Sequence, residues 1–193
     1  MSDLSDIRRR HLKLMDKTGK TVGHIIAQMS QDDASLWRDG GTGWTVLEVL
    51  GHLLDYEKIF HHRAVMMLEQ NYPQLPAFDH EALVIAGAYN TKSKEEVYRD
   101  FMNARAAFRA FFEYLDDAGW EKTGIHPERG HFSMTDAVIQ AGHHAADHLA
   151  SQVVEVLRHH DVGQTRVGLA AQVDDVLRPF QQFGHGAGQA RHA

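Results

Sequence analysis

The sequence predicts an all-α fold: one four-helix bundle, followed by a short amphipathic helix and a flexible tail. Four long segments repeat apolar residues at three- and four-residue spacing, turn-forming residues separate them, and no convincing strand alternation is present. A chain of 193 residues is most simply one domain with a substantial core. We therefore expect the bundle in residues 1–162 and a C-terminal extension in residues 163–193.

The first helix is predicted over residues 4–29, where the apolar positions largely share one helical face. Gly19 and Gly23 weaken this pattern without interrupting it. The glycine-rich segment 38–43 then ends a short helix around Leu36.

The second helix is predicted to begin after Thr45, and its apolar stripe runs from Val46 to Met67. Glu48 stands three residues after Thr45, which is the spacing of a capping box. Pro73 and Pro76 disfavour a helix in the segment that follows.

The third helix is predicted to begin at Ser93, again with a glutamate three residues later. The sequence DDAGW marks its end, and residues 124–130, GIHPERG, are predicted to form a loop. The apolar residues of this helix follow a nearly heptad spacing: Val97, Phe101, Ala104, Phe108, Phe111 and Leu115.

The fourth helix is predicted from Ser133 to His160, with Asp136 as the acidic partner at its start. Residues 169–180 then indicate a shorter amphipathic helix, and residues 184–193 a flexible tail. The apolar face of the shorter helix must cover either the bundle or a second subunit, and a homodimer is one expectation.

Composition narrows the classes of function. The formal net charge is −6 and the only basic cluster is residues 8–13, which disfavours a nucleic-acid partner. Cysteine is absent, so thiolate nucleophiles and cysteine-bound metals are excluded. The N-terminus carries charges where a secretory signal is apolar, and no run is long enough to span a membrane. These features predict a cytoplasmic protein without a membrane partner.

Histidine is the unusual residue, with 15 in the chain. His144 and His148 stand one helical turn apart on the same predicted face, so both imidazoles can reach one metal ion. About one such pair is expected by chance at this histidine content. The pair nevertheless lies on the inward half of its helix, where a polar ring without a partner is costly to bury.

His52 is the third candidate ligand. It lies two turns inside the second helix, between apolar neighbours, and a third imidazole from another helix completes a tetrahedral site that keeps one open position. The alternative is a core histidine bonded to a neighbouring carbonyl, and the residues alone leave both interpretations open.

At these residues the chain resembles the DinB-like family, which includes the YfiT-type metalloenzymes, over residues 5–160. The family is a four-helix bundle, and its usual metal ligands correspond to His52, His144 and His148. Many members have a second histidine directly before the last ligand, where this chain has Asp147, a residue we expect to face water. Three segments in register carry the resemblance: GWTVLEVLGHLLDYEKIFHHR, AYNTKSKEEVYRDFMNARAAFRAFF and FSMTDAVIQAGHHAADHLASQVVEVLR.

The resemblance implies a divalent metal ion, most simply zinc or nickel. A water or thiol in the open position would lose its proton near neutral pH. Two activities follow: hydrolysis of a small-molecule substrate, or transfer or isomerisation with a low-molecular-weight thiol, as in relatives that use mycothiol or bacillithiol. Arg129 is a candidate for holding a substrate carboxylate. The alternatives are a non-catalytic, metal-binding stress-response bundle and a purely structural role for the histidines.

Overall fold

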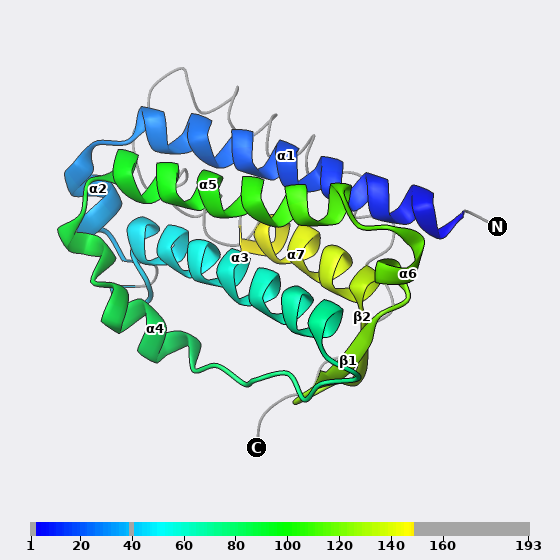
Figure 1. Cartoon of the computed structure of the whole chain (residues 1–193). Coiled ribbons are helices and arrows are strands. Elements are labelled where there is room, and N and C mark those ends of the chain that lie inside the picture. Colours follow the sequence, from blue (N-terminus) through cyan, green and yellow to red (C-terminus); the bar gives the residue numbers. More distant parts are fainter. Residues whose placement is uncertain (1–2, 39–40, 149–193) are drawn as a thin grey trace, which may run out of the picture.

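The computed structural model describes residues 3–38 and 41–148 and confirms the predicted four-helix bundle. Each of the four long helices begins after a residue whose side chain accepts a hydrogen bond from the first turn, as the sequence indicates for Thr45, Ser93 and Ser133; the cap of the first helix, Asp3, was not predicted. The bundle consists of α1 (Leu4–Gln28), α3 (Val46–Glu69), α5 (Lys94–Glu113) and α7 (Met134–His148) (Figure 1).

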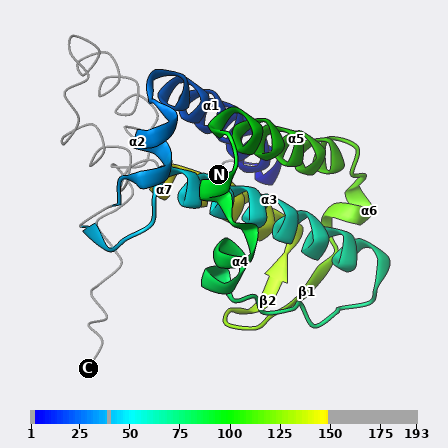
Figure 2. The same cartoon turned by 90° about the vertical axis from the view of Figure 1, so that its left-hand side faces the viewer.

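Neighbouring helices in the bundle are not always consecutive in the chain. α3 packs against α5 and α7, and α1 packs against the same two helices, so α1 and α3 occupy opposite corners (Figure 2). α7 therefore lies in the groove between the first two long helices. This placement brings residues near position 144 beside residues near position 52.

Shorter elements complete the described chain. Two of them, α4 and the hairpin of β1 and β2, lie on the side of α3 that faces away from α1 and α5 (Figures 1 and 2). The shorter elements are α2 (Gln31–Leu36), α4 (His80–Gly87), a 3-10 turn (Tyr89–Thr91), α6 (Asp117–Trp120), β1 (Thr123–His126) and β2 (Gly130–Ser133).

The hairpin corrects the prediction of a loop over residues 124–130. β1 and β2 pair antiparallel, and Gly130 adopts φ +72°, a left-handed conformation that glycine accepts without strain. Ile125 also exchanges backbone hydrogen bonds with Pro73 and Leu75, which ties the hairpin to the segment after α3. Strands of four residues are too short for alternation to be recognised in the sequence. Helix α4 was not predicted either.

The inward face of α5 also differs from the predicted one. Arg105 and Phe112 are buried, whereas Ala104 and Phe111 are only half-buried. The heptad interpretation failed because it excluded a charged residue from the core. Arg105 is 2% exposed and forms an ion pair with the equally buried Glu57.

The core consists of two apolar clusters separated by a polar layer. One cluster contains Leu50 and Phe101, and the other contains Phe60 and Phe108. Arg105 lies between the two clusters on α5, and it donates to Glu57, to the Thr18 hydroxyl and to the Met15 carbonyl. His144 lies at this layer on α7, between Ala141 of one cluster and Ala145 of the other, and its ring lies beside that of His52 on α3.

Some predictions lie outside the described residues: the part of the fourth helix after His148, and the whole extension 163–193 with its amphipathic helix. The homodimer and the cytoplasmic location stay predictions. In the described part of the chain, no helix is both long and apolar enough to cross a bilayer.

Candidate metal centre

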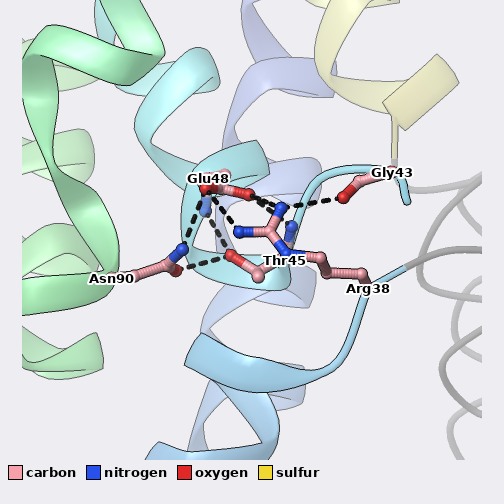
Figure 3. Close-up of polar contacts among 5 residues, drawn as sticks. All are labelled: Arg38, Gly43, Thr45, Glu48 and Asn90. Atoms are coloured by element: carbon pink, nitrogen blue, oxygen red, sulfur yellow. Dashed lines mark hydrogen bonds and ion pairs between the residues drawn. The ribbon is translucent and has the colours of Figure 1, made fainter. Parts of the chain in front are cut away.

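A polar network fixes the start of α3 (Figure 3). Thr45 and Glu48 form the predicted capping box, with Thr45 N–H donating to Glu48 Oε2 at 2.8 Å and Glu48 N–H donating to Thr45 Oγ1 at 3.1 Å. Arg38 donates to both oxygens of Glu48, and Asn90 donates to Oε1. Although partial burial acts to raise it, these hydrogen bonds and the charge of Arg38 hold the pKa of Glu48 below its usual range.

This network sets the axial position of every residue on the first turns of α3, including His52. Gly51 allows the Tyr89 ring to approach the backbone of α3 closely, because a Cβ at this position would lie 2.0 Å from the ring. The Tyr89 hydroxyl in turn donates to Asp55 Oδ1 at 2.8 Å. These contacts anchor the part of α3 that carries His52, whose ring lies beside His144 on α7.

The structure brings the three predicted ligands together. One possible ligand atom from each of His52, His144 and His148 lies within 4.8 Å of the others. The Nε2 atoms of His52 and His144 are 3.2 Å apart, and the ring centroids of the three histidines are 4.7 to 5.0 Å apart. An ion bound at 2.0–2.1 Å by two nitrogens in tetrahedral geometry requires about 3.3 Å between them.

The electrostatics of the cluster favour neutral imidazoles. Burial, with smaller contributions from the neighbouring histidines, lowers the pKa of His52 to about 3 and that of His144 to about 2. Burial also lowers the pKa of His148. A neutral ring keeps a lone pair for coordination. Among the residues that the structure describes, Nδ1 of His148 is moreover buried without a hydrogen-bond partner, which is compatible with a role as a metal ligand.

Tyr56 lies against the cluster, one turn after His52. Its ring stacks on His144, and its hydroxyl lies 3.0 Å from Nε2 of His80. Burial raises the pKa of Tyr56 and lowers that of His80, so both groups are neutral and either can donate the hydrogen of this bond, depending on the His80 tautomer. The His80 ring also meets the His52 ring edge-on, at 5.6 Å between centroids.

His80 is the residue of the site that sequence reasoning missed. It begins α4, a helix of eight residues that carries too weak a periodic pattern to be predicted. The one available signal was Asp79, which caps this helix by accepting a hydrogen bond from Ala82 N–H. Nothing in the sequence indicates that α4 folds back beside His52.

A cavity of about 450 Å³ lies beside the cluster, with His144 on its wall. Arg129 and His131 from the hairpin line it, as do Gln140 and His143 from α7. The volume is in the range of small-molecule sites. Arg129, the candidate for holding a substrate carboxylate, therefore borders a cavity next to the histidines.

Other titratable residues near these positions in the sequence do not belong to the cluster. Asp147 is exposed, and His143 contacts His11 rather than the three histidines. Glu57 is engaged with Arg105, which makes it unsuitable as a base. His61 is half-buried against Phe108 and Phe111, whereas His62 is exposed.

The residues present fit a divalent transition-metal ion. Three neutral imidazoles from two helices supply borderline donors, which zinc, nickel and copper accept, whereas calcium and magnesium prefer oxygen ligands. The fold and the cluster thus define a helical bundle with a candidate three-histidine metal centre.

The sequence matches the model of the DinB superfamily over residues 12–151, and the chain belongs to this superfamily.

Two solved proteins have a similar fold. One is YfiT from Bacillus subtilis, described as a probable metal-dependent hydrolase with an unusual four-helix bundle topology. Its sequence is 15% identical, the TM-score is 0.65, and the match covers 90% of this chain and 87% of YfiT. The other is the mycothiol-dependent maleylpyruvate isomerase, with 9% identity and a TM-score of 0.62. That match covers 82% of this chain and 70% of the isomerase. No curated protein sequence matches this chain significantly.

Proposed function

We propose that the protein is a metal-dependent enzyme in which His52, His144 and His148 bind one divalent cation, zinc or nickel. The observation that carries the proposal is the convergence of three neutral imidazoles beside a cavity of small-molecule size. With three protein ligands, a fourth position stays open for an exchangeable nucleophile. When bound, the cation would lower the pKa of that nucleophile and polarise the substrate.

The nucleophile that we favour is a low-molecular-weight thiol, which makes the protein a thiol S-transferase or isomerase. The chain has no cysteine, so the thiol must arrive as a cosubstrate. Similarity to the mycothiol-dependent maleylpyruvate isomerase supports this proposal. Similarity to YfiT, described as a probable metal-dependent hydrolase, favours water as the second candidate.

Residues of this chain have distinct parts in the proposed reaction. When the Nε2 hydrogen of His80 is donated to it, the Tyr56 hydroxyl can direct its own hydrogen to the oxygen on which negative charge develops. Arg129 is exposed on the cavity wall and can pair with an anionic group of the substrate. The apolar neighbours of His52, including the Trp44 ring at 4.9 Å between centroids, limit the access of bulk water.

The experiment uses full-length protein without a histidine tag, loaded with zinc or with nickel. Conjugation of a model electrophile is measured with a panel of small thiols, and ester hydrolysis is measured without thiol. We expect activity in one assay that His144→Ala abolishes and that the exposed-residue control His62→Ala preserves.

Each result decides between the candidates. Retention of most activity in His144→Ala overturns the assignment of the centre. Binding of the metal without activity in either assay replaces the enzyme by a non-catalytic metal-binding bundle. A protein purified with less than about a tenth of an equivalent of metal, and unable to take up more, overturns both.

A further inference from the structure

A second pair of histidines joins two helices outside the cluster already described. His11 on α1 and His143 on α7 face each other with their Nε2 atoms 3.2 Å apart. Their ring centroids are 5.1 Å apart and their planes are inclined by 53°. For His52 and His144 the corresponding values are 3.2 Å, 5.0 Å and 55°. The two pairs therefore present their nitrogens to each other in nearly the same way.

The His11 ring is oriented by the backbone. Its Nδ1 lies 2.7 Å from the carbonyl oxygen of Ile7, one turn earlier on α1. A carbonyl only accepts, so the hydrogen of the neutral ring is on Nδ1 and the lone pair is on Nε2, directed at His143. A hydrogen bond from the far nitrogen to a carbonyl is also the usual support of a metal-bound histidine.

The surroundings suit a cation with open coordination positions. Both rings are half-buried, and His143 lines the cavity of about 450 Å³ beside α7. Asp147 follows His143 by one helical turn, lines the same cavity, and its charge acts on the His143 ring. The site thus offers two imidazoles from different helices, with the Asp147 carboxylate on the wall of the same cavity.

We propose that His11 and His143 bind a second divalent transition-metal ion, of the zinc, copper or nickel class that imidazole prefers. The Nε2 separation of 3.2 Å agrees with the value of about 3.3 Å for two nitrogens on one tetrahedral ion. Water would fill the remaining coordination positions, and the negative charge of Asp147 on the wall of the same cavity would favour the cation. With two imidazoles in place of three, this ion binds more weakly than the ion of the main centre.

Successive residues of α7 then serve different ions. His143 and His144 point about 100° apart around the helix, one toward α1 and the other toward α3. The proposal does not depend on catalysis at the main centre, because it concerns binding alone. The competing arrangement is a direct hydrogen bond in which the Nε2 hydrogen of His143 is donated to His11.

The test is a zinc titration of the full-length, tag-free protein by equilibrium dialysis, with bound zinc counted per chain. We expect a tight class of site and a weaker one. His11→Ala and His143→Ala should each remove the weaker class and keep the tight one. His144→Ala should remove the tight class and keep the weaker one, and the control His62→Ala should keep both.

Several results contradict the second site. If His11→Ala retains both classes, or if the wild type binds no more zinc than His11→Ala at any concentration, His11 and His143 form only a hydrogen-bonded pair. His11→Gln is the second variant, because glutamine preserves hydrogen bonding at a half-buried helical position and keeps the protein folded. Zinc bound by other histidines contributes equally to the wild type and to each variant, so it does not affect the difference in bound zinc between them.

Discussion

The ring of Tyr56 lies flat on the ring of His144, with 3.7 Å between the centroids and 10° between the planes. This contact joins α3 to α7 at the level of the histidine cluster, and the tyrosine hydroxyl extends beyond it to His80 on α4. The face of the Tyr56 ring therefore positions the proposed ligand His144, and the Tyr56 hydroxyl places a polar group beside the cluster.

Tyr56→Phe separates these two contributions. The ring remains, so metal content should stay at the wild-type level, whereas loss of the hydroxyl should lower kcat by about 100-fold. Metal analysis and steady-state kinetics on the same preparation check this expectation. Tyr114→Phe is the matched control, because Tyr114 is 90% exposed. Equal activity in the two variants would exclude the hydroxyl from the reaction.

Metal binding should stabilise the fold through His144. A ligand that binds only the native state raises the free energy of unfolding by about 2.7 kcal/mol when its concentration is 100 times its Kd. We expect the Tm of the wild type to rise with zinc and fall with chelator. The Tm of His144→Ala should respond far less, while His62→Ala should respond as the wild type does. Thermal unfolding followed by circular dichroism gives the measurement.

The stability of the metal-free protein should depend on pH through the cluster. The pKa values of His52 and His144 are lowered from 6.5 to about 3 and about 2, so between these limits only the unfolded chain binds protons at these rings. The two neutral rings therefore make their full contribution to the free energy of unfolding above about pH 6.5. This contribution decreases as the pH falls toward 3. Urea titrations across this range measure the slope.

The same titrations on His144→Gln should give a shallower slope, because one buried ring no longer takes up a proton on unfolding. His62→Gln should keep the wild-type slope, since this residue is exposed. Identical slopes in the wild type and His144→Gln would show that the cluster does not govern the acid response.

The buried ion pair of Glu57 and Arg105 should matter most when only one partner is removed. Arg105 donates to Glu57 Oε1 from Nε at 2.9 Å and from Nη2 at 2.6 Å, and burial raises the pKa of Glu57 while Arg105 opposes that shift. Arg105→Met leaves a buried carboxylate without its cation and should cost about 3–5 kcal/mol.

Replacing both charges with Glu57→Leu and Arg105→Met should recover most of that loss, because the polar layer then becomes apolar. Denaturant unfolding of the two single variants and the double variant measures this recovery. The exposed pair of Arg99 and Asp100 serves as control, and Arg99→Ala should change stability little. A double variant as unstable as the sum of the single variants would contradict the expectation.

The local sequence pattern was sufficient to predict where the long helices occur. Thr45 with Glu48, and Ser93 with Glu96, stand at the starts of α3 and α5, because capping depends on residues only three apart. The apolar stripes of α1 and α3 likewise follow from helical periodicity. Arg105 defeated this reasoning, since its burial depends on a glutamate 48 positions earlier.

The candidate site was predictable only in part. His144 and His148 share a face by their spacing, and the family resemblance associated them with His52. His80, and the pairing of His11 with His143, were beyond sequence reasoning. The partners in these cases are separated by 24 and 132 positions, and nothing in the sequence near each residue indicates the other.

The sequence by itself determined the helices, their caps and the supply of imidazoles, because those properties depend on neighbours within one or two turns. The tertiary structure decided which imidazoles meet, because side-chain contacts between helices depend on which helices are adjacent and on their axial register. In this bundle, the position of α7 between α1 and α3 directs His143 to one neighbour and His144 to the other.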